Sequence, residues 1–146
     1  MQEFYKSWLR EKLEKYLEVR VSHAKLLQDI EYLETKLEGK TVASYGESLG
    51  YSSSGSADEK FLNKLAEFDV LKTNYEESLK LINDVEYAIA ELNDMELDIL
   101  LTLYGTKKRD NKVERLMKKY NYQERQIYRI GNYAAEEVSV KLFGNR

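Results

Sequence analysis

The chain of 146 residues has no cysteine and no proline, and it contains only seven glycines and one histidine. Without cysteine, disulfides and thiolate metal sites are excluded, which is typical of a reducing compartment. Without proline, and with Leu, Glu and Lys dominating, the composition favours helices, because these straight-chain residues lose little rotamer freedom there. The sequence therefore predicts an all-α fold.

Targeting and membrane signals are also missing from the sequence. Residues 1–8 lack the basic-then-apolar pattern of a signal peptide. No stretch approaches the roughly 20 apolar residues that span a bilayer. We therefore expect a cytoplasmic protein with no membrane partner.

Charge is divided unevenly along the chain, although the net charge is only −3. Residues 1–106 carry 12 Lys and Arg against 21 Asp and Glu, whereas residues 107–146 carry 11 against 5. A net of −9 is thus followed by a net of +6. This asymmetry indicates a basic binding face on an otherwise acidic protein.

Two long helices are predicted in the first part of the chain, over residues 2–38 and 57–92, joined by a flexible Gly/Ser-rich loop over residues 39–56. Each carries an apolar stripe at spacings near three and four. The first stripe is Leu9, Leu13, Tyr16, His23, Leu27, Ile30 and Leu37, and the second is Phe61, Leu65, Phe68, Tyr75, Leu79, Ile82, Ile89 and Leu92. Residues 1–92 are therefore expected to form a long antiparallel helical hairpin for oligomerisation or partner binding.

Shorter helices are predicted after residue 92. Asn93 with Glu96 three residues later forms a capping-box pattern, and Gly105 is expected to end that helix in the left-handed conformation. Asn111 with Glu114 repeats the capping pattern at the start of a second helix.

The last two helices, over residues 112–120 and 123–143, are separated by a tight turn at Asn121, a residue type that tolerates positive φ. A short helix, a short turn and a helix that starts polar and then turns apolar define a helix-turn-helix. We expect its small core to contain Leu116, Tyr120, Tyr122, Ile127 and Ile130. Residues 93–146 are thus predicted to be a three-helix DNA-binding domain.

The exposed start of the last helix is expected to read double-stranded DNA in the major groove, because Gln and Arg match adenine and guanine edges. The base-reading candidates are Gln123, Glu124, Arg125, Gln126, Tyr128 and Arg129. The candidates for phosphate contacts, which set affinity and register, are Lys107, Lys108, Arg109, Lys112, Arg115, Lys118 and Lys119.

The segments NDMELDILLTLYG, residues 93–105, and VERLMKKYNYQERQIYRIGNYAAEEV, residues 113–138, resemble the sigma-factor region that reads the −35 promoter element. The chain as a whole is similar to phage-encoded late transcriptional regulators of the ArpU/RinA-like group. That family usually opens its recognition helix with Ser or Thr, where this chain has Gln123, a poorer N-cap. The resemblance implies a sigma-like domain that activates a phage or prophage late operon, either as a dimer through the hairpin or as a monomer contacting host RNA polymerase.

A different class of function stays open: a coiled-coil adaptor or small phage packaging protein whose C-terminal helices only complete a bundle. An enzyme is not expected, and neither is a cofactor. Gly39-Lys40-Thr41 resembles the end of a phosphate-binding loop, but Glu34 stands where that loop needs glycine. The lone His23 lies on an apolar stripe, where packing is the default role.

Overall fold

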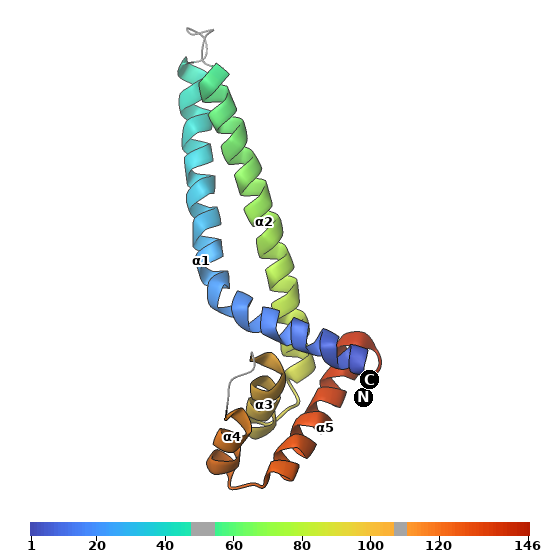
Figure 1. Ribbon diagram of the computed structural model, residues 1–146. Helices are drawn as coiled ribbons and strands as arrows, with labels where there is room; N and C mark the ends of the chain where they lie inside the picture. Colours follow the sequence, from blue (N-terminus) through green and yellow to red (C-terminus); the bar gives the residue numbers. More distant parts are fainter. Residues whose placement is uncertain (48–54, 107–110) are drawn as a thin grey trace. The chain divides into compact units, whose positions relative to one another are not determined.

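The computed structural model describes residues 1–47, 55–106 and 111–146, and these residues form helices without any strand (Figure 1). The all-α prediction is therefore confirmed. In chain order the elements are α1 (Glu3–Glu47), α2 (Gly55–Ile89), α3 (Asp94–Leu100), the π-helix η1 (Leu101–Gly105), α4 (Lys112–Tyr120) and α5 (Glu124–Phe143).

The loop predicted over residues 39–56 is mostly helical instead. The α1 helix continues through Gly39 to Glu47, and α2 already begins at Gly55. A helical glycine costs only about 1 kcal/mol relative to alanine, and helix propagation is cooperative once a nucleus exists. Glycine composition alone was therefore a poor signal for the end of this helix; residues 48–54 lie outside the described part.

The chain packs as two compact units whose boundaries differ from the predicted division after residue 92. The first unit combines Met1–Arg20 with Lys80–Arg146, and the second is Val21–Leu79. The start of the first hairpin helix and the end of the second therefore belong to the unit that contains α3, α4 and α5.

The second unit consists of α1 from Val21 to its end and of α2 up to Leu79, and these two segments run antiparallel and side by side (Figure 1). Ile30 and Leu37 are buried there, and the His23 ring stacks on Tyr75 with centroids 4.7 Å apart. The expectation that His23 is a packing residue is thus confirmed.

The core of the first unit joins residues that lie far apart in the sequence. It is formed by α1, α2, α3, η1 and α5, through the buried residues Leu9, Leu13, Tyr16, Val85, Ala88, Ile89, Leu100, Tyr104, Ala134, Ala135 and Val138. Two glycines allow close approach within this unit: a Cβ on Gly105 would lie 3.0 Å from Leu17, and one on Gly131 would lie 2.5 Å from Leu103. Gly105 is not left-handed as predicted, and its role is to let α1 approach η1.

A second, smaller core holds α3, α4 and α5 together. Ile99, Leu116 and Ile127 are buried at its centre, and the side chains around them include Tyr120, Tyr122 and Ile130. All five residues predicted for the helix-turn-helix core are therefore in this cluster.

Candidate nucleic-acid interface

The turn between α4 and α5 has the backbone that the sequence predicted. Asn121 adopts φ 55° and ψ 44°, the left-handed conformation, and its N–H donates to the carbonyl of Met117. Tyr122 N–H donates to the same carbonyl at 3.2 Å. These two bonds close the end of α4 and fix the point from which α5 departs.

The start of α4 differs from the prediction. Asn111 is the N-cap residue, but it has φ 72° and its side chain makes no capping hydrogen bond, so the capping box with Glu114 does not form. A left-handed residue cannot present its side chain to the helix N–H groups as an extended N-cap does. By contrast, the Asn93 capping box is confirmed: Glu96 N–H donates to Asn93 Oδ1 at 2.8 Å.

The first two turns of α5 expose every predicted base-reading side chain. They comprise the exposed Gln123, Glu124, Arg125, Gln126, Tyr128 and Arg129, while Ile127 between them is fully buried. Neither Arg125 nor Arg129 forms an ion pair with a residue in the described part of the chain. Two guanidinium groups are thus presented on one outward face.

The N-terminal end of α5 ties down one of these side chains. Gln123 is the N-cap residue, and its N–H donates to Gln126 Oε1 at 3.0 Å. That bond uses one of the two acceptor sites of Oε1 and leaves the amide N–H₂ group open to a ligand. Bidentate recognition of adenine needs both the donor and the acceptor of the amide, so the bond restrains the orientation in which Gln126 can read adenine.

The basic residues of α4 are less available than the sequence suggested. Lys119 Nζ lies 2.7 Å from Asp98 Oδ2, and Lys112 Nζ donates to the carbonyl of Thr106 at 2.9 Å. Arg115 is exposed but lines a groove that also contains Glu14 and Glu18 of α1.

Of the other four phosphate candidates, Lys118 is exposed on α4. Lys107, Lys108 and Arg109 lie outside the described residues. Lys118 is therefore an exposed α4 candidate that forms no ion pair within the described ranges.

Asp98 acts as the link between α3 and α4. Burial alone raises the pKa of Asp98, but hydrogen bonds from Lys119 and Tyr120 outweigh it and hold the pKa below its usual value. The carboxylate is therefore charged at neutral pH and anchors the end of α4 to α3. Its partner Lys119 is held as a structural group rather than a free phosphate contact.

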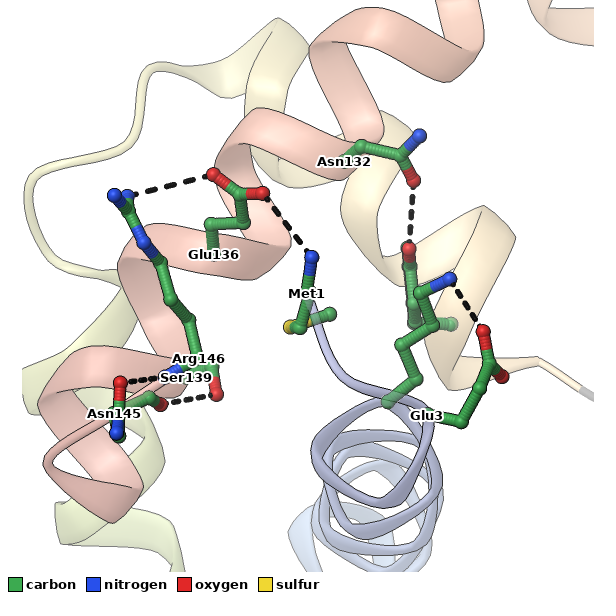
Figure 2. A network of polar contacts seen from close by, with 9 residues as sticks. Met1, Glu3, Asn132, Glu136, Ser139, Asn145 and Arg146 are labelled. Carbon is green, nitrogen blue, oxygen red and sulfur yellow. Dashed lines mark hydrogen bonds and ion pairs between the residues drawn. The ribbon is translucent and has the colours of Figure 1, made fainter.

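A groove of about 580 Å³ runs along one side of α5, between α1 and the start of α4. Tyr128 and Asn132 of α5 line it, and Lys6 and Arg10 of α1 lie at the same groove. The Tyr104 hydroxyl donates to Asn132 Oδ1 at 2.8 Å, a bond drawn in Figure 2, so the Asn132 amide presents N–H₂ outward. Burial raises the pKa of Tyr104, which keeps its hydroxyl protonated as the donor.

A polar network fixes the far part of α5 (Figure 2). Glu136 lies 3.6 Å from the amino group of Met1 and 3.5 Å from Arg146 Nη1. The buried Ser139 hydroxyl donates to the carbonyl of Asn145 at 2.7 Å. These contacts hold both the first turn of α1 and the end of the chain against α5.

Four residues at this surface were not among the sequence predictions. Asn132 and the exposed Tyr133 follow Arg125 and Arg129 at helical spacing, and extending the exposed face by one turn beyond Arg129 would have found them. Lys6 and Arg10 left no such signal, because their place beside α5 depends on tertiary packing.

Other kinds of site find no support in the described ranges. Across residues 1–47, 55–106 and 111–146, no group of three or more His, Cys, Asp or Glu side chains is placed to hold a metal ion. In the same ranges no helix is long and apolar enough to cross a bilayer. In comparisons with known proteins, no family model, curated protein or solved structure matches this chain.

Proposed function

We propose that this chain binds double-stranded DNA by placing the first turns of α5 in the major groove, and that it regulates transcription. The observation that supports the proposal is the outward face of α5, where Arg125 and Arg129 carry guanidinium groups that form no ion pair with any residue in the described part of the chain. An α-helix with its side chains is about 10–12 Å across and the major groove is about 12 Å wide.

The packing of α5 against α3 and α4 supports the insertion of its exposed face into the major groove. Ile127 is fully buried against α3 and α4, so the helix cannot rotate without losing its core. The left-handed Asn121 sets the direction in which α5 leaves α4. A rigid helix with a fixed exposed face is what base reading requires, because each bidentate contact depends on placement within a few tenths of an ångström.

The resemblance to phage late regulators extends the proposal to control of a late operon. The salt dependence of binding to the DNA upstream of the neighbouring operon tests the first step. We expect the logarithm of the binding constant to fall linearly with the logarithm of salt, with a slope of roughly −0.9 per phosphate neutralised. Binding that is absent, or indifferent to salt, would refute the proposal.

The role of α5 is tested by Arg125→Ala with Arg129→Ala. We expect sequence preference to be lost, at about 1–3 kcal/mol for each bidentate base contact. The matched control is Lys15→Ala with Lys25→Ala, which removes the same charge from exposed positions of α1. If the control pair weakens specific binding as much as the arginine pair, α5 is not the reading helix.

A second candidate is a helical adaptor, and the surface of the second unit favours it. Val21, Tyr32, Leu62 and Val70 are all more than half exposed there, with exposed fractions of 85%, 60%, 61% and 58%. Scattered apolar side chains are common on surfaces, but a two-helix unit with few buried residues gains stability from a partner. If the chain is an adaptor, Leu62→Glu with Val70→Glu abolishes its function, and Arg125→Ala with Arg129→Ala leaves the function intact. If the chain is a DNA regulator, the arginine pair abolishes sequence-specific DNA binding, and the changes at Leu62 and Val70 leave that binding intact.

A further inference from the structure

Two basic side chains of α1, Lys6 and Arg10, lie on the side of α5 that also faces the start of α4. Lys6 and Arg10 are one helical turn apart, and both line the groove that Tyr128 and Asn132 of α5 form. The Arg10 guanidinium lies 5.0 Å from the centre of the Tyr104 ring. Tyr104 in turn holds Asn132, so a continuous chain of contacts runs from Arg10 to the exposed face of α5.

The position of these two side chains beside α5 is set by packing. Leu9 and Leu13, on the adjoining face of the same helix, are fully buried in the core that contains Ala134 and Val138. The Met1 amino group adds an ion pair to Glu136 of α5 at 3.6 Å (Figure 2). The two turns therefore cannot swing away from α5 without opening the main core of the unit.

Acidic side chains line the grooves on both flanks, since Glu114 and Glu124 lie at the groove of Lys6 and Arg10, so the difference from α4 lies in the ion pairs. On α4, Lys119 is neutralised by Asp98, and Arg115 faces a groove with Glu14 and Glu18. On α1, Lys6 pairs with Glu3 at 2.8 Å, but the Glu3 side chain is 87% exposed. An exposed ion pair contributes little to stability, and its partners separate readily in water. A phosphate can therefore replace the Glu3 carboxylate as the partner of Lys6.

We propose that α1 forms the edge of the DNA-binding surface and that Lys6 and Arg10 contact the phosphate backbone beside the major groove occupied by α5. The proposal rests on the DNA-binding function proposed above. A helix that fills the major groove has a sugar-phosphate strand along each flank, and groups at the flanks fix its register. Lys6 and Arg10 take the flanking role that the sequence assigned to Lys112 and Lys119.

The test uses the full chain and a duplex from the upstream region, with binding measured by fluorescence anisotropy at several salt concentrations. For Lys6→Ala with Arg10→Ala we expect the salt slope to become shallower by about 1.8, for two phosphates lost. Between 50 and 200 mM salt, this variant then loses about 12-fold less affinity than the wild type loses. The control pair Lys15→Ala with Lys25→Ala should keep the wild-type slope.

Two further variants separate charge from packing. Arg10→Lys keeps the positive charge and gives up the guanidinium stacking on Tyr104, so it should keep the slope. Glu3→Gln removes the competing carboxylate and should tighten binding without reducing the slope. If Arg10→Lys loses as much slope as Arg10→Ala, the effect comes from packing and the inference is overturned.

The outcomes also distinguish this inference from the proposed function. A wild-type chain that does not bind DNA overturns the proposed function. A wild-type chain that binds with a steep salt slope, together with a Lys6/Arg10 variant of unchanged slope, overturns only the role of α1.

Discussion

Replacing Leu13 by alanine tests whether the start of α1 is part of the unit that contains α5. Leu13 has no exposed surface, and a Cβ built on Gly105 would lie 3.8 Å from the Leu13 Cβ, so the side chain packs against η1. Truncating a buried leucine costs about 2–5 kcal/mol, depending on how far the surroundings collapse. Helices on several sides of Leu13 limit that collapse, so we expect the free energy of unfolding to fall by about 3 kcal/mol.

A loss of about 3 kcal/mol lowers the melting temperature of a unit of this size by roughly 12–24 °C. It also accelerates globally limited amide exchange by about 150-fold. The informative measurement is hydrogen exchange at Ala134 and Val138 of α5, which lie more than a hundred residues from the substitution.

The control for this experiment is Lys15→Ala, an exposed position two residues away on the same helix. It should change stability by no more than about 0.5 kcal/mol. If Leu13→Ala leaves exchange in α5 at the wild-type rate, then α3 to α5 fold without α1. The boundary would then lie near residue 92, and the composite core described above would be wrong.

Two other predictions concern the helix-turn-helix. Asn121→Ala places a Cβ-bearing residue without Asn's local hydrogen bonding at φ 55° and should cost about 1 kcal/mol in urea unfolding, whereas Asn121→Gly should stay within about 0.5 kcal/mol; equal costs would argue against the left-handed turn. The second concerns Asp98, whose folded-state pKa lies below its usual value. Its contribution to stability is therefore fully present above the unfolded pKa of about 3.9 and is lost as pH falls through the folded value. Asp98→Asn should flatten the acid limb of a stability–pH profile and leave Lys119 without its partner, and an unchanged acid limb would contradict this assignment.

Some local signals in the sequence predicted local structure, whereas the cap at Asn111 and the left-handed Gly105 did not form. The Asn93 capping box depends on residues three apart, and the turn at Asn121 depends on the conformational tolerance of one residue. The core around Ile127 follows from the spacing of apolar side chains along two adjacent helices. In each case the sequence pattern and the structure it specifies lie within one or two turns.

Long-range packing was beyond those patterns. Periodicity showed that Leu9 and Leu13 lie on an apolar face, but it assigned that face to α2 alone, whereas the core also includes Ala134 and Val138 of α5. The same limit applies to the site. The number of lysines in α4 predicted a positively charged surface. The ion pair between Lys119 and Asp98 depends on the packing of α3 against α4, which the sequence pattern does not predict.

The composite first unit has a consequence for the order of folding during synthesis. The second unit, Val21–Leu79, is made of contiguous chain and can form while translation continues. The first unit has to wait for Lys80–Arg146, which at about 5–20 residues per second takes roughly 3–13 s more. During that interval Leu9, Leu13 and Tyr16 have no core to enter, so the nascent chain carries an exposed apolar start that a chaperone can bind. A message truncated before α5 yields a chain that lacks Ala134, Ala135 and Val138 of this core, so the remaining apolar side chains stay exposed to chaperones and proteases.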